Sequence, residues 1–149
     1  MDKGIFFLLA ILGGVSLAMQ GGLNAQLGVQ LKSSILASLV AFVFSAFFAL
    51  LLVLALTRTS MDFNLYRKVP AYLWFSGAFF SVIGICLYYY TIPKLGISTM
   101  ISLGLFGQLL FATIAGHFGW FGLPNEPLAT NRALGIFAMA LGIFLMNKN

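Results

Sequence analysis

Charged residues are scarce in this sequence, and their scarcity decides the class of protein. Asp, Glu, Lys and Arg together make up 7% of the 149 residues, whereas a soluble domain carries about 25%. A water-exposed surface cannot be built from so few charges. Hydrophobic residues make up 61% of the chain and the mean hydropathy is +1.03. The composition therefore predicts a protein embedded in the lipid bilayer.

Acidic residues are the rarest charges, and all three of them, Asp2, Asp62 and Glu126, lie outside the apolar runs. Proton-coupled antiporters and sites for organic cations usually have a carboxylate inside the membrane. The apolar runs of this chain offer none, so a neutral lining is expected. The eight Lys and Arg residues are scattered rather than clustered, which argues against a nucleic-acid partner.

Metal-binding and catalytic motifs are also missing from the sequence. The single cysteine, Cys86, can form no intrachain disulfide, and no Cys or His spacing suits a metal. No Gly-Lys pair opens a phosphate-binding loop, and no nucleophile has a base beside it. We therefore expect no metal, no cofactor and no enzymatic activity, and we interpret Cys86 as a packing residue.

Long apolar windows between the charges predict five membrane-spanning helices in a single transmembrane domain, residues 1–149. A span needs about 20 apolar residues, and in hydrocarbon the backbone must satisfy its own hydrogen bonds, which favours helices. The last window is short, and it spans only if Arg132 extends its side chain to the headgroups. The predicted helices cover about 4–27, 34–57, 70–91, 96–117 and 128–147.

Several signals predict where these helices end. Pro93, followed by Gly96, is typical of a turn, and the two Gly and two Pro of residues 119–127 exclude a continuous helix there. The three tyrosines of residues 88–90 lie near a predicted helix end, as the aromatic belt of membrane proteins does. Residues 57–70 form the one connection with a cluster of charges.

One helix face in the first span is unusually polar. Gly13, Ser16, Gln20 and Asn24 fall within an arc of about 80° on a helix. An amide buried in hydrocarbon without partners costs several kcal/mol, so Gln20 and Asn24 must meet other helices, water or a ligand. We interpret this face as the lining of an internal substrate pathway, with helix packing as the alternative.

Similar faces recur in the later spans. The predicted pathway residues are Ser16, Gln20, Asn24, Ser38, Trp74, Ser81, Tyr88, Ser102 and Gln108. Trp74 and Tyr88 could form an aromatic wall. Small residues also let membrane helices approach closely, so packing is the alternative at each of these positions. In the last span, Gly135, Ala138 and Gly142 share one side, which we interpret as a packing or dimer contact.

His117 lies at the end of the fourth predicted span, where a positive charge would suit the C-terminus of a helix. An imidazole there could titrate near neutral pH. The alternative is a local hydrogen-bonding group at the membrane interface.

The basic residues predict only a weak orientation. Five of them, Lys3, Arg58, Arg67, Lys68 and Arg132, would lie on the side of the N-terminus, and three, Lys32, Lys94 and Lys148, on the other side. The positive-inside rule then favours a cytoplasmic N-terminus, but the small bias allows insertion in both orientations. Two copies of opposite orientation could pair as an antiparallel dimer, as in transporters with inverted repeats.

The second half of the chain carries a series of motifs in a fixed order. IPKLGISTMISLGLFGQLL (92–110) contains Gly107 and Gln108, and the segment after it begins with His117, Phe118 and Gly119. Arg132 then leads into a last helix that bears glycines. With Gln20 and Asn24 in the first half, this order resembles the five-helix YdcZ-type family of the drug/metabolite transporter superfamily, over nearly the whole chain.

The resemblance implies an exporter of the bacterial inner membrane. The superfamily's common plan has ten helices in two inverted halves, so this all-α chain resembles one half, completed by dimerisation. The partner would be a second, antiparallel copy or a homologous short protein. The family commonly has an Asp immediately before the His, where this chain has Gly116.

Together these observations predict a secondary transporter that moves a small polar or neutral metabolite by alternating access. A membrane subunit that needs a homologous partner, and a passive channel, are the alternatives. Substrate, coupling ion and direction do not follow from the sequence.

Overall fold

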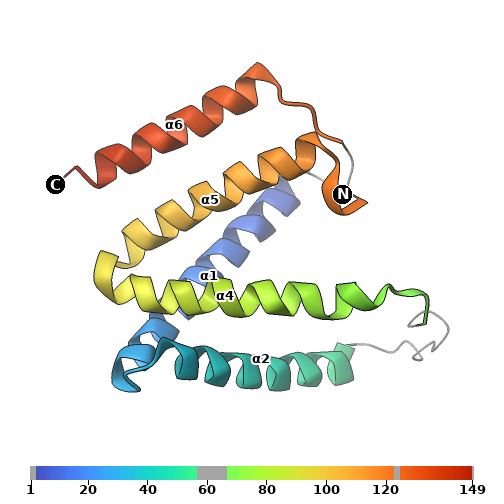
Figure 1. Cartoon of the computed structure of the whole chain (residues 1–149), viewed down its shortest axis with the longest axis vertical. Coiled ribbons are helices and arrows are strands. Elements are labelled where there is room, and N and C mark those ends of the chain that lie inside the picture. Colours follow the sequence, from blue (N-terminus) through green and yellow to red (C-terminus); the bar gives the residue numbers. More distant parts are fainter. Residues whose placement is uncertain (1–2, 57–66, 123–124, 149) are drawn as a thin grey trace. The chain divides into compact units, whose positions relative to one another are not determined.

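The computed structural model describes residues 3–56, 67–122 and 125–148, and every regular element in these ranges is helical. The chain divides into two compact units, residues 1–94 and residues 95–149, which are described separately. Figure 1 labels the elements. They are α1 (Lys3–Gln30), α2 (Ser34–Leu56), α4 (Ala71–Leu95), α5 (Ile97–His117), the 3₁₀ turn η1 (Trp120–Gly122) and α6 (Thr130–Met146).

The predicted all-α fold is confirmed: the described residues form five helices of 17 residues or more, four of which meet the length and apolarity of a membrane span. Helices α1, α2, α4 and α5 are each long and apolar enough to cross a membrane. Helix α6 has 17 residues, which span about 25 Å at 1.5 Å per residue, slightly less than the roughly 30 Å hydrocarbon core. The charge cluster predicted in residues 57–70 lies mostly outside the described residues.

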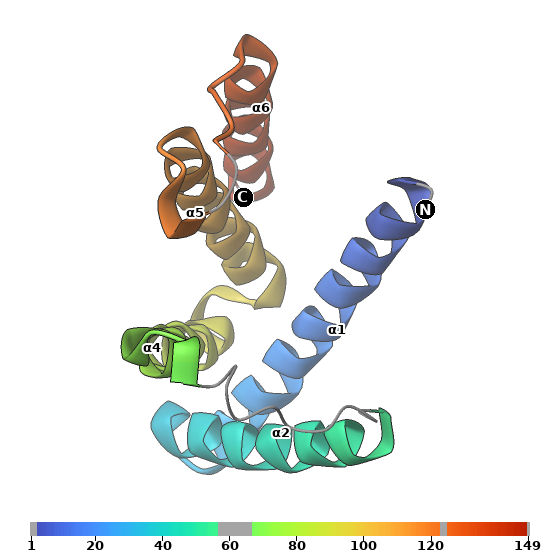
Figure 2. The ribbon, with the colours of Figure 1, turned by 90° about the vertical axis from the view of Figure 1, so that its right-hand side faces the viewer.

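A tight turn joins α1 to α2. Lys32 has a φ of 52°, and the hydroxyl of Ser33 accepts a hydrogen bond from the backbone N–H of Leu36 at 3.2 Å, as an N-cap does. The two helices meet beside this turn and splay apart away from it (Figure 2). The packed part of the first unit therefore lies between the C-terminal half of α1 and the start of α2.

Small residues allow the close approach of α1 and α2. A Cβ placed on Gly28 would lie 3.5 Å from the Ala37 Cβ and 3.5 Å from the Ser34 Cα. Gly28 and Ala37 are both buried. The approach follows the rule that small side chains let membrane helices pack backbone to backbone.

Pro93 does not end its helix, contrary to the predicted turn. Helix α4 continues through Pro93 to Leu95, and the break comes at Gly96, whose φ is 81°. Pro93 has no N–H to donate to the carbonyl of residue 89, yet the helix continues until Gly96, whose left-handed conformation suits glycine. The third helix is accordingly longer than predicted at its C-terminal end.

Most large apolar side chains lie on the outside of each unit. Phe7 is 68% exposed, Phe75 73% and Phe137 69%. Among the described residues, the buried hydrophobic side chains are Ala25, Ala37, Tyr89, Ile92 and Ala115. Such a surface suits contact with hydrocarbon rather than water.

We predict that the α1–α2 contact tolerates one methyl group and no more. Gly28→Ala should leave the stability unchanged, because its Cβ would make ordinary contacts at 3.5 Å. Gly28→Leu should destabilise the protein by about 1–3 kcal/mol, because it overfills the contact. Thermal unfolding in detergent measures both variants. Gly14→Leu is the control, since nothing lies within 4 Å of a Cβ there, and an equal loss in this control would contradict the prediction.

Candidate substrate pathway

The polar face of α1 meets a single buried side chain of α4. The hydroxyl of Tyr89 accepts a hydrogen bond from Gln20 Nε2 at 3.1 Å and another from Asn24 Nδ2 at 2.9 Å. Tyr89 is 1% exposed, and both amides are half-buried. We call these three side chains the amide–phenol cluster. Gln20 and Asn24 reach the same hydroxyl because residues four apart lie on one face of a helix.

The rest of the inner face of α4 packs around this cluster. Ile92 Cδ1 lies 3.5 Å from the position of a Cβ on Gly21, so the glycine leaves room for the isoleucine. Cys86 Sγ lies 2.9 Å from the Ser38 hydroxyl of α2, which also donates to the carbonyl of Ile35. Cys86, Tyr89 and Ile92 follow one another at the spacing of one helix face.

Of the pathway residues predicted in the first unit, the structure brings Gln20 and Asn24 together on Tyr89. Ser16 is exposed, and its hydroxyl donates to the carbonyl of Leu12 within α1. Trp74 is 51% exposed and Ser81 is exposed, while Tyr88 is half-buried. The predicted face of α4 that ends at Tyr88 thus lies about 100° from the face that holds Tyr89.

The sequence did not predict that Tyr89 belongs to the site, because Tyr88, Tyr89 and Tyr90 were together assigned to an aromatic belt. Tyr90 fits that prediction, since it is 54% exposed and Lys94 Nζ lies 3.4 Å from the centre of its ring. Tyr89 is buried instead. The spacing of Cys86, Tyr89 and Ile92 is the signal that separates it from its neighbours.

In the second unit, the predicted polar residues lie on α5. Ser102 is half-buried, and its hydroxyl donates to the carbonyl of Ser98 at 2.8 Å, while Gln108 is exposed. His117 is the last residue of α5, and its Nδ1 accepts a hydrogen bond from the backbone N–H of Leu128 at 3.4 Å. This contact is the local hydrogen bond that was the alternative to a titrating role.

The connection from α5 to α6 folds back onto the last turn of α5. The Glu126 N–H donates to the carbonyl of Gly116 at 2.8 Å, and Arg132 donates to the Glu126 carboxylate at 2.7 Å. Glu126 Oε2 lies 3.8 Å from the position of a Cβ on Gly116. A carboxylate from the connection therefore lies beside the helix position that precedes His117.

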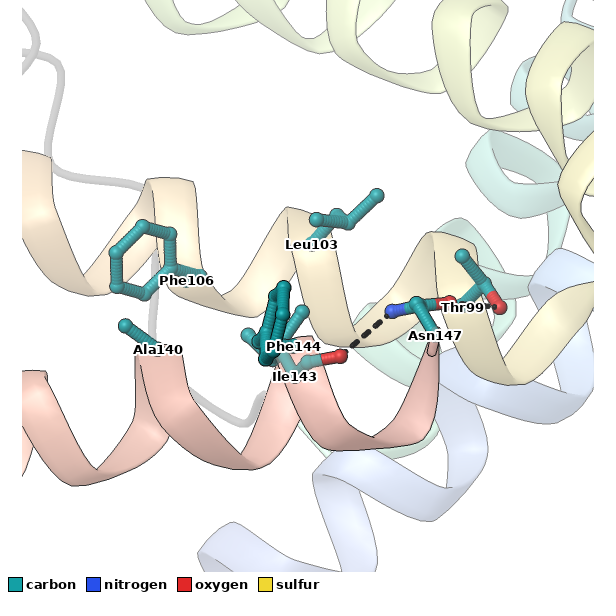
Figure 3. A pocket seen from close by; sticks show the side chains of 7 residues that line it. All are labelled: Thr99, Leu103, Phe106, Ala140, Ile143, Phe144 and Asn147. Atoms are coloured by element: carbon teal, nitrogen blue, oxygen red, sulfur yellow. Dashed lines mark hydrogen bonds between the residues drawn. The ribbon is translucent and has the colours of Figure 1, made fainter. Parts of the chain in front are cut away.

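An open groove of about 460 Å³ runs between α5 and α6. Figure 3 shows Leu103 and Phe106 of α5 with Ala140, Ile143 and Phe144 of α6 along it. At one end the Thr99 hydroxyl donates to Asn147 Oδ1 at 2.8 Å. The groove is apolar along its length and polar at this end.

The predicted packing residues of the last helix do not line this groove. Gly135, Ala138 and Gly142 are exposed, and nothing lies within 4 Å of a Cβ built on either glycine. This side of α6 is free of contacts with the described part of the second unit. A contact with a second copy stays a prediction.

The described residues contain no group of three His, Cys, Asp or Glu side chains that could hold a metal ion. Both units contain long apolar helices. In the first unit, amide, hydroxyl and thiol groups are hydrogen-bonded to one another between helices. These features define a small multi-pass membrane protein with polar groups between its helices.

The chain belongs to the YdcZ family. The family's sequence model, described as "Putative inner membrane exporter, YdcZ", matches residues 5–145. Neither a curated protein nor a solved structure gives a significant match. The resemblance inferred from the motifs is thus confirmed, and the protein is a multi-pass protein of an inner-membrane exporter family rather than of an enzyme family.

Removing one hydroxyl tests the amide–phenol cluster. Tyr89→Phe should lower the stability by about 1 kcal/mol, because two amides lose their shared acceptor. Thermal unfolding in detergent measures the loss. Tyr90→Phe is the matched control, because this exposed ring keeps its face toward Lys94. Equal stabilities of the two variants would contradict the cluster.

A second carboxylate tests the fold of the α5–α6 connection. Gly116→Asp should lower the stability by about 0.5–1 kcal/mol, because two carboxylates would lie side by side. Glu126→Gln in the same chain should relieve part of that loss. A double-mutant cycle measured by thermal unfolding gives the coupling. Strictly additive losses would place Glu126 away from Gly116.

Proposed function

We propose that the protein is a secondary transporter that exports a small neutral, zwitterionic or weakly polar solute. The observation that carries this proposal is the amide–phenol cluster, in which Gln20 and Asn24 of α1 meet Tyr89 of α4. Each amide is costly to bring into hydrocarbon, and the cluster places both of them on one buried hydroxyl between helices. The membership of the exporter family supports the same function.

The predicted pathway residues are assigned to this function. Ser16 extends the polar face of α1 beyond the cluster, and Ser38 of α2 lies beside Cys86 of α4. A pathway role for Trp74, Ser81 and Tyr88 in the first unit, and for Ser102 and Gln108 in the second, stays a prediction.

We further propose that two copies of opposite orientation form the working unit and rock about the site. One five-helix chain resembles half of an inverted-repeat transporter. The weak bias of five basic residues against three supports insertion in both orientations. The exposed small face of α6, with Gly135, Ala138 and Gly142, is the proposed contact between copies. The rival to a homodimer is a pair with a homologous short protein.

Transport by purified protein in liposomes tests the function. Counterflow of a panel of uncharged, zwitterionic and cationic solutes should reveal exchange, which a passive channel does not produce. Asn24→Leu should slow the exchange by about tenfold, corresponding to 1.4 kcal/mol in the barrier. Gln26→Leu is the matched control, because this exposed amide lies about 160° from Asn24 around α1. Failure of the wild-type protein to exchange any solute would favour a partner-dependent subunit.

Reporters fused to the C-terminus test the antiparallel dimer. Alkaline phosphatase and a fluorescent protein, which are active on opposite sides of the inner membrane, should both give a signal. Adding two lysines after Lys32 should shift the population, because it would cancel the bias of five basic residues against three. A signal from one side only would contradict self-pairing in opposite orientations.

A further inference from the structure

The amide–phenol cluster does not use all of its hydrogen-bond donors and acceptors within itself. A tyrosine hydroxyl accepts two hydrogen bonds and donates one. Gln20 Nε2 and Asn24 Nδ2 occupy both accepting positions of the Tyr89 hydroxyl. Among the described residues, no acceptor receives the hydrogen of that hydroxyl, although Tyr89 is 1% exposed. A buried O–H group without an acceptor is unfavourable, so this hydrogen favours an amide orientation that offers it an oxygen.

The two amides add further free positions. Each amide spends one N–H on Tyr89, and neither carbonyl oxygen is hydrogen-bonded among the described residues. Turning one amide about its last torsion would place its oxygen on the phenolic hydrogen and leave its NH₂ free. In both arrangements the cluster offers a ligand donors as well as acceptors.

The cluster offers these groups without a formal charge. No described Lys, Arg, Asp or Glu side chain is hydrogen-bonded to Gln20, Asn24 or Tyr89. A charged solute would lose its hydration there and gain no counter-ion, which is strongly unfavourable away from water. An uncharged solute exchanges its hydrogen bonds to water for bonds to the amides and the phenol.

We propose that the amide–phenol cluster binds an uncharged solute with neighbouring N–H or O–H donors and acceptors, of the carboxamide or polyol class. This inference rests on the proposed function and names the substrate class of its site. The ligand meets the half-buried amides, donating to a free carbonyl oxygen and accepting from a free N–H, while the buried Tyr89 hydroxyl holds the two amides in place.

A matched series of three-carbon compounds tests the class. Malonamide is uncharged, malonate is an anion and 1,3-diaminopropane is a cation, so they differ mainly in charge. Calorimetric titration of the purified full-length protein should show binding of malonamide at least about tenfold tighter than binding of the other two, because only malonamide matches uncharged donors and acceptors. Tyr89→Phe should weaken malonamide binding by about fivefold to tenfold, because the two amides lose the hydroxyl that positions them.

A charge-introducing variant keeps the test decisive if Tyr89→Phe unfolds. Asn24→Asp should favour 1,3-diaminopropane over malonamide by at least about tenfold, since a carboxylate would replace a neutral amide. Gln26→Glu, on another face of α1, and Tyr90→Phe should both keep the wild-type preference.

Three results would overturn the inference: tighter binding of malonate or 1,3-diaminopropane than malonamide by the wild-type protein, an unchanged affinity in Tyr89→Phe, or no binding of malonamide. Vesicle counterflow separates this failure from failure of the proposed function. Exchange of charged solutes without malonamide binding would leave transport standing and remove the substrate class. Malonamide binding without exchange of any solute would leave the site standing and remove the transport.

Discussion

The need to give every polar side chain a partner away from water is the constraint on which the first unit depends. Gln20 and Asn24 could not lie between helices without an acceptor, and Tyr89 supplies it. The same need explains the Ser38–Cys86 contact and the hydroxyls that bond back to their own helices, such as Ser102 and Thr113. Polar contacts thus fix which helix faces meet, because an apolar face gains no hydrophobic stabilisation from leaving lipid for another helix.

Small residues then set how closely those faces approach. Gly21 leaves room for Ile92, and Gly28 lies against Ala37, so the helices converge where their glycines lie. Away from these positions α1 and α2 diverge (Figure 2). The arrangement leaves the two amides half-buried rather than sealed, which is the state that a site for a passing solute requires.

The sequence was sufficient for the fold class and for part of the site. The rarity of charges and the lengths of the apolar windows predicted five helices, and the four-residue spacing of Gln20 and Asn24 placed both on one face. The partner of that face could not be predicted, since three successive tyrosines differ only in their rotation about α4. The end of α4 was misjudged because Pro93 was read as the stop signal, whereas the helix ends at Gly96, which adopts a left-handed conformation. The fold-back of Glu126 onto Gly116 depends on a backbone path that no residue pattern encodes.

That fold-back has a consequence for how the protein enters the bilayer. Arg132 lies in the first turn of α6, a helix slightly shorter than the hydrocarbon core is thick, and a lone arginine near hydrocarbon resists partitioning. Its contact with Glu126 at 2.7 Å gives the leading end of the hairpin a net charge near zero. The backbone bond from Glu126 to Gly116 holds that neutral end against α5. Arg132 therefore meets the edge of the bilayer already paired with a carboxylate of its own hairpin, which lowers the cost of its charge there.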